Sequence, residues 1–194
     1  TLFRSDLVIF LNGIAIFTFE LKCNTSGQNY EDAIRQYKFE RDYKTRLLKF
    51  KAGCLAHFAM DLNEVYMCTN LRGKSSFFLP FNKGCGVGIH SGKGNPHNEN
   101  GINVSYMWED ILKKDTVLYL IDKIIFLQKE TKKDPDTGKR VTKETLIFPR
   151  YHQFNAVRKL VADVVEHHSE KNYLIEHSAG SGKTNTIAWL AHRL

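Results

Sequence analysis

Hydrophobic and polar positions alternate near the start of the chain, a pattern that predicts β-strands. Residues 6–11 and 14–22 are rich in β-branched and aromatic side chains and flank Asn12-Gly13, a dipeptide typical of two-residue hairpin turns. We therefore expect two antiparallel strands there. The same kind of pattern predicts strands over 55–61 and 65–69, and a short strand over 77–81.

Helical spacing replaces this alternation in other segments. Apolar residues recur every three or four positions over 29–45, 108–113, 116–128 and 150–168, and a further helix is expected from Lys183. A glycine- and asparagine-rich segment, 82–101, predicts a long loop. A short buried strand is expected over 173–176, directly before a glycine-rich turn.

The order of these elements predicts an α/β protein with two parts. We expect one domain over 1–128 and the start of a second over 147–194, joined by a charged linker or hairpin over 129–146. The chain begins within a predicted strand and stops within a predicted helix, so we expect it to be a fragment of a longer protein.

Composition narrows the class of protein. Hydrophobic residues make up 42% of the chain and charged residues 25%, which excludes disordered, collagen-like and coiled-coil proteins. Four scattered cysteines, without a C-x-x-C pair, favour reduced thiols in a cytoplasmic protein. No apolar stretch reaches the ~20 residues of a membrane span, so no membrane partner is expected.

The net charge of +7 favours a polyanionic partner. Residues 35–51 hold seven basic side chains and two acidic ones, so most of the excess lies in one stretch. Arg35, Lys38 and Arg41 fall on one face of the predicted helix, beside Gln36, and we expect these four residues to contact a DNA backbone. The alternative is a solvated helix face.

The sharpest motif is the segment His177-Ser-Ala-Gly-Ser-Gly-Lys-Thr184, between a predicted strand and a predicted helix, as a Walker A loop requires. Backbone N–H groups of Gly180, Ser181 and Gly182 would surround the phosphates of ATP, with Lys183 on the outer phosphates and Thr184 on Mg²⁺. His177 replaces the usual first glycine. A chance glycine-serine turn at a helix start is the alternative.

A second nucleotide-binding element precedes this loop by about thirty residues. Phe148-Pro149 followed by Gln153 resembles the element of superfamily 2 helicases in which the glutamine binds the adenine edge. Taken alone, this pattern could also be a proline at a helix start.

Three charged residues on the first hairpin suggest a different chemistry. Asp6, Glu20 and Lys22 form the pattern Asp…Glu-x-Lys, in which two carboxylates hold Mg²⁺ and a lysine stabilises charge during phosphodiester cleavage. Glu20 and Lys22 share a face of their strand. A plain turn would pair Asp6 with Phe19 on the opposite face, so this function requires a bulge or a twisted strand end. An ordinary charged hairpin end is the alternative.

Taken in this order, the motifs resemble the restriction (R) subunit of type I restriction enzymes. The resemblance implies a PD-(D/E)xK nuclease-like mixed sheet with flanking helices, followed by the first strand-loop-helix of a P-loop RecA-like motor domain. It also implies Mg²⁺-dependent cleavage of double-stranded DNA coupled to ATP-driven translocation, in complex with methylation (M) and specificity (S) subunits.

The resemblance assigns roles to individual residues. Asp6 and Glu20 become metal ligands and Lys22 the catalytic lysine, while Lys183 and Thr184 bind phosphates and Mg²⁺ and Gln153 binds adenine. The family often shows Gln-x-x-x-Tyr after the catalytic strand, whereas Gln36 is followed by Glu40 here, with Tyr37 or Tyr43 as substitutes. The Walker B carboxylates would lie beyond Leu194, so we expect little ATP hydrolysis by these residues alone.

Two other classes of protein remain open. One is a superfamily 2 helicase-like, DNA-dependent ATPase whose N-terminal domain binds DNA without cutting it. The other is a P-loop kinase or signalling ATPase in which the basic helix docks a protein.

Overall fold

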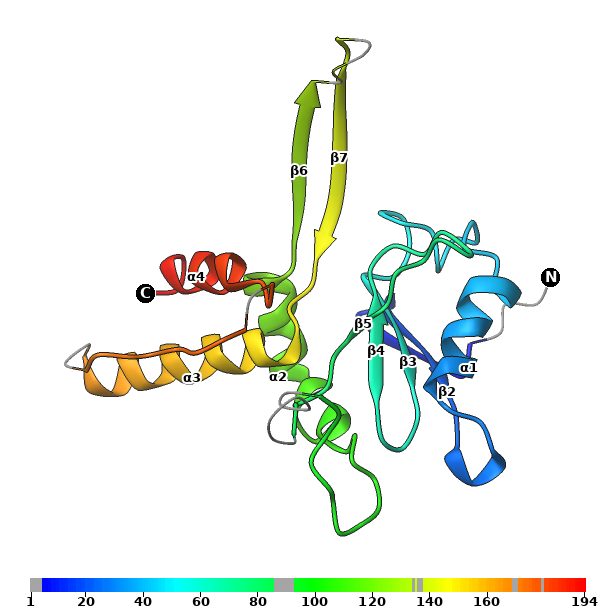
Figure 1. Ribbon diagram of the computed structural model, residues 1–194, viewed down its shortest axis with the longest axis horizontal. Helices are drawn as coiled ribbons and strands as arrows, with labels where there is room; N and C mark the ends of the chain where they lie inside the picture. Colours follow the sequence, from blue (N-terminus) through cyan, green and yellow to red (C-terminus); the bar gives the residue numbers. More distant parts are fainter. Residues whose placement is uncertain (1–4, 86–92, 134, 136–137, 169–170, 179) are drawn as a thin grey trace.

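The centre of the molecule is a mixed five-stranded sheet. The computed structural model describes residues 5–85, 93–133, 135, 138–168, 171–178 and 180–194 (Figure 1). The sheet has the order β1-β2-β3-β4-β5, and only the β2–β3 pair is parallel. Its strands are β1 (Leu7–Leu11), β2 (Ile14–Leu21), β3 (Ala56–Met60), β4 (Val65–Cys68) and β5 (Leu79–Pro80). The fold is therefore mixed α/β, as the sequence predicted.

Helical segments flank this sheet and follow it. The first ones are η1 (Asn24–Ser26), α1 (Tyr30–Arg35) and its π-helical continuation η2 (Gln36–Glu40). Later come η4 (Met107–Ile111), α2 (Lys114–Tyr119), η5 (Leu120–Ile124), α3 (Tyr151–His167) and α4 (Lys183–Ala191). A separate two-stranded hairpin, β6 (Phe126–Lys133) and β7 (Arg140–Ile147), projects away from the other elements (Figure 1).

The sheet is covered on both faces. Alternate residues Phe17, Phe19 and Phe58 join one large apolar cluster, which also contains Phe148 and Trp189 from the second half of the chain. Ala59 and Cys68 lie on the other face, where a smaller cluster forms with Ala33, Tyr37, Leu48 and Leu71. Strand β2, which lies between β1 and β3, is consequently buried on both faces.

The large cluster runs across the boundary that we predicted between two domains. The ring of Phe148 packs against three rings of the sheet, with centroids 6.0 Å from Phe17, 5.9 Å from Phe58 and 5.8 Å from Phe81. The indole of Trp189 donates to the carbonyl of Ile124 at 2.8 Å. The division at 129–146 stays a prediction, because packing alone does not test it.

Three predicted elements differ from the structure. The helix expected over 29–45 ends at Glu40, since Arg41 has an extended backbone with φ −96° and ψ 128°. The helix expected over 116–128 ends at Ile124, and the aromatic and branched residues that follow pair with β7 instead.

The buried strand expected over 173–176 is wrong. In the structure this segment forms no strand and is exposed, with Leu174 96% accessible. A strand needs neighbours for its backbone hydrogen bonds, and no described strand lies beside these residues. Tyr173 instead donates its hydroxyl to Asp163 of α3.

A series of buried hydrogen bonds lies between the sheet and the helix formed by α1 and η2. The Thr18 hydroxyl is 2.9 Å from the Tyr37 hydroxyl and 2.8 Å from Nδ1 of His57. All three residues are buried. Burial disfavours the charged imidazole and lowers the pKa of His57 to about 3.

This pKa makes stability depend on pH. Below its ordinary pKa of 6.5 His57 takes up a proton in the unfolded chain but stays neutral in the folded one, so acid favours unfolding. From pH 7.5 to pH 5 we expect His57 alone to lower the free energy of unfolding by roughly 2 kcal/mol. Urea unfolding at several pH values measures this change.

Two substitutions make the measurement specific. His57→Asn keeps a polar atom near Nδ1 but cannot be protonated, and should lose this part of the pH dependence. His97→Asn, at an exposed position, should keep it. An equal pH dependence in all three proteins would contradict a neutral, buried His57.

Candidate active site

A β-bulge brings Asp6 to the same side of the hairpin as Glu20. The turn at Asn12-Gly13 has positive φ at both residues, 48° and 80°, as a tight hairpin requires. Phe10 pairs with Ala15, but Ile9 pairs with Phe17, so Ile16 is the extra residue. Leu7 therefore lies opposite Phe19, which places Asp6 next to Glu20 and confirms the bulge that the function required.

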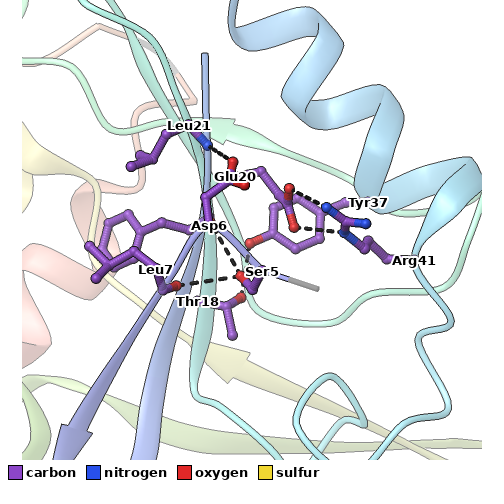
Figure 2. A network of polar contacts seen from close by, with 9 residues as sticks. Ser5, Asp6, Leu7, Thr18, Glu20, Leu21, Tyr37 and Arg41 are labelled. Atoms are coloured by element: carbon purple, nitrogen blue, oxygen red, sulfur yellow. Dashed lines mark hydrogen bonds and ion pairs between the residues drawn. The ribbon is translucent and has the colours of Figure 1, made fainter. Parts of the chain in front are cut away.

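Asp6, Glu20 and Lys22 form one charged cluster at this end of the hairpin (Figure 2 shows the two carboxylates). Asp6 is exposed, and its Oδ2 accepts a 2.8 Å hydrogen bond from the backbone N–H of Leu21. The charges of Asp6 and Lys22 both act on Glu20, the first raising and the second lowering its pKa. Asp6 and Glu20 thus lie side by side, and both Asp6 and Lys22 are near enough to Glu20 to influence its pKa.

Glu20 is paired with a residue that we had assigned to DNA contact. Arg41 donates from Nε to Oε1 and from Nη2 to Oε2, both at 2.7 Å (Figure 2). The side chains are 1% exposed for Glu20 and 16% exposed for Arg41. Burial raises the pKa of Glu20, and the hydrogen bonds and charge of Arg41 oppose this rise. The carboxylate in turn raises the pKa of Arg41.

The other predicted DNA contacts lie on the helix that ends at Arg41. Arg35 is exposed, and Gln36 and Lys38 are half-buried. The Oε1 atom of Gln36 is buried without a hydrogen-bond partner among the described residues. The Tyr37 hydroxyl is buried and hydrogen-bonded to Thr18, whereas Tyr43 is exposed. Of these two tyrosines, Tyr43 is therefore the one available to a ligand.

The donor set of this cluster suits a hard cation. Among the described residues, no three His, Cys, Asp or Glu side chains come together as a metal cage. Mg²⁺ is commonly held by one or two carboxylates, with water and substrate phosphates completing its shell. Asp6 and Glu20 fit that type of site, although both oxygens of Glu20 are engaged by Arg41.

The predicted phosphate loop leads into α4 as expected. Gly180 and Gly182 have positive φ, 73° and 84°, and Gly182 caps the helix. Lys183 folds back, and its Nζ donates to the carbonyl of His177 at 2.9 Å. Thr184 is exposed, the Ser181 hydroxyl is buried without a partner in the described part of the chain, and Ala179 of the motif lies outside that part.

Gln153 lies directly against this loop. Its Nε2 donates to the carbonyl of Gly182 at 2.8 Å, and its Oε1 accepts from the backbone N–H of Arg150. A cavity of about 420 Å³ beside these residues is lined by Gln153, Ser181, Gly182 and Asn185, together with β4 and β7 residues. The structure therefore brings together Gln153 and the glycine-rich loop, the two features for which the sequence predicted nucleotide binding.

The pairing of Arg41 with Glu20 was missed by the sequence analysis. The sequence predicted Glu20 as a metal ligand or as part of a charged hairpin end, so no arginine partner was expected. In the structure Glu20 is buried, and a buried carboxylate requires a cation nearby. Arg41 was instead counted with Arg35 and Lys38, since a helix continuing to Thr45 would have placed all three on one face.

No helix of the described residues is long and apolar enough to cross a membrane.

Comparisons with known proteins give a consistent result. Residues 1–76 match the model of the type I restriction enzyme R protein N terminus, which includes the whole Asp6, Glu20 and Lys22 cluster. No solved structure shows a significant match.

A longer match comes from a protein of Methanocaldococcus jannaschii, provisionally named the endonuclease subunit of the type I restriction enzyme MjaVIIIP. The two sequences are 29% identical over an alignment 201 residues long, and this alignment includes 96% of the present chain. The chain spans 16% of the length of that relative. The resemblance to type I restriction enzyme R proteins is thus confirmed. Residues 1–76 match the family model, and the similarity to the named relative extends over 96% of the chain.

Proposed function

We propose that this chain is the nuclease region, with the start of the motor region, of a type I restriction enzyme R subunit. The complete protein would cut double-stranded DNA with Mg²⁺, driven by ATP-dependent translocation, in complex with M and S subunits. The cytoplasm is the proposed location, since these enzymes act on DNA. The observation that carries the proposal is the bulge that brings Asp6 to the same side of the hairpin as Glu20.

Each residue of the Asp6, Glu20 and Lys22 cluster would have a separate role in phosphodiester hydrolysis. Asp6 and Glu20 would hold Mg²⁺, which supplies Lewis-acid stabilisation and an activated water when bound. Lys22 carries a fixed positive charge to the same face and would stabilise negative charge that develops on the phosphate. Arg35, Gln36 and Lys38 lie on the adjoining helix and would bind the DNA backbone.

The nucleotide would bind at the loop that begins α4. Gly180, Ser181 and Gly182 would present backbone N–H groups to ATP, Lys183 would contact its outer phosphates, and Thr184 would bind the accompanying Mg²⁺. Gln153 would contact the adenine. The contact between Gln153 and Gly182 supports this part of the proposal, because it holds both motifs in one place.

Lys22→Ala in the complete protein tests the nuclease site. We expect DNA cleavage in the presence of Mg²⁺ and ATP to fall by about 100-fold or more, because a positioned charge at the reacting phosphate is lost. DNA affinity should change little. Cleavage of a supercoiled plasmid and gel-shift titration measure the two effects.

Lys114→Ala removes an exposed lysine at the start of α2 and provides the control, for which cleavage should not change. Full cleavage by Lys22→Ala would reject the nuclease site. DNA-stimulated ATP hydrolysis without any cleavage by the wild type would favour the helicase-like alternative.

Lys183→Ala tests the nucleotide site. Removing a charge-assisted contact to phosphate should weaken binding of a fluorescent ATP analogue by about tenfold or more. Lys159→Ala, on the exposed side of α3, should bind the analogue normally. Unchanged binding by Lys183→Ala would reject the assignment of the loop, and ATP hydrolysis insensitive to duplex DNA would favour the kinase or signalling class.

A further inference from the structure

The ion pair between Glu20 and Arg41 occupies the same atoms that a metal ion would use. Each oxygen of the carboxylate accepts one 2.7 Å hydrogen bond from the guanidinium. This fork-to-fork geometry is the strongest arrangement that an arginine and a carboxylate form. The Glu20 side chain is 1% exposed, and among the described residues its carboxylate forms a salt bridge with Arg41 alone.

Glu20 needs a cation because of its position. It is buried on β2, an inner strand of the sheet, and an unpaired charge at such a site is strongly destabilising. Arg41 meets this need in the structure, and a divalent ion bound by Asp6 and Glu20 would meet it as well. Both cations at once would place like charges a few ångströms apart, which opposes simultaneous binding.

The chain is built so that Arg41 can change partners. Arg41 is the residue at which η2 ends, and its extended backbone leads into an exposed turn held by the Asp42 side chain. Among the described residues, Arg41 donates from its backbone N–H to the carbonyl of Gln36, and its side chain donates only to Glu20. Release from Glu20 would therefore free a long cationic side chain next to the helix that carries Arg35 and Lys38.

We infer that Arg41 is an internal counter-ion which competes with the divalent metal ion for Glu20. In the absence of metal it neutralises Glu20 and holds the carboxylate in place. Metal binding displaces it, and the released guanidinium is then available to a DNA phosphate. The metal site would thus be filled at the same time as Arg41 joins Arg35 and Lys38 in contacting DNA. The inference rests on the proposed nuclease function, of which it describes a regulatory step.

Binding of Mn²⁺ to the complete protein, without DNA or ATP, tests the competition. Arg41→Gln should bind Mn²⁺ about tenfold more tightly than the wild type by calorimetry, because the competing cation is gone. Its melting temperature without metal should be lower, and the rise caused by Mn²⁺ should be larger. Arg41→Lys, which keeps the charge but not the fork, should bind with intermediate affinity.

Arg46→Gln is the matched control, since it removes an exposed arginine five positions away and should bind Mn²⁺ like the wild type. Equal or weaker binding by Arg41→Gln would overturn the competition alone. If neither the wild type nor Arg41→Gln binds Mn²⁺, the proposed metal site fails, and this inference with it.

A measurement on the wild type does not depend on the folding of a variant. The Nε–H of Arg41 should give a ¹⁵N NMR signal protected from exchange without metal, because it is bonded to Glu20. Saturating Mg²⁺ should abolish that protection. A signal that stays protected at saturating Mg²⁺ would also overturn the inference.

Discussion

Burial of β2 on both faces is the constraint from which the rest of the structure follows. Its odd-numbered residues Phe17 and Phe19 join the aromatic cluster, and its even-numbered residues Thr18 and Glu20 face α1. Polar groups at such positions require partners within the protein. Thr18 bonds to Tyr37 and Glu20 to Arg41, and both partners come from the helix that crosses from β2 to β3 or from its end. The place of this helix, and the residue at which it stops, are thus tied to two side chains of one strand.

Sequence patterns predicted those parts of the fold that depend on neighbouring residues. Asn12-Gly13 indicated the hairpin correctly, and apolar spacing located α3 to within a residue at each end. The bulge was predicted indirectly, because only a changed register could bring Asp6 beside Glu20. The two segments predicted to bind a nucleotide were chosen by their spacing, and in the structure Gln153 contacts Gly182.

Interactions between distant residues explain what the sequence could not show. Arg41 is 21 positions from Glu20, and no local pattern states that a helix will end so that such a pair can form. Residues 126–128 fit a helix or a strand by composition, and pairing with β7 decided between them. A strand over 173–176 failed for a related reason, since strand formation depends on neighbours that a single segment does not specify.

The bulge at Ile16 has a consequence for the mutations that this hairpin can tolerate. Side chains alternate along a strand, so the direction of Asp6 depends on which residue of β2 lies opposite it. A substitution at Ile16 leaves this pairing unchanged, and deletion of Ile16 would remove the bulge but keep Asp6 opposite Glu20. Deletion of Val8 from β1 would instead place Asp6 opposite Phe19 and turn its carboxylate toward the face of Phe17 and Phe19. All three charged residues would remain in the sequence while the site was lost, so a one-residue gap in β1 matters more than many substitutions.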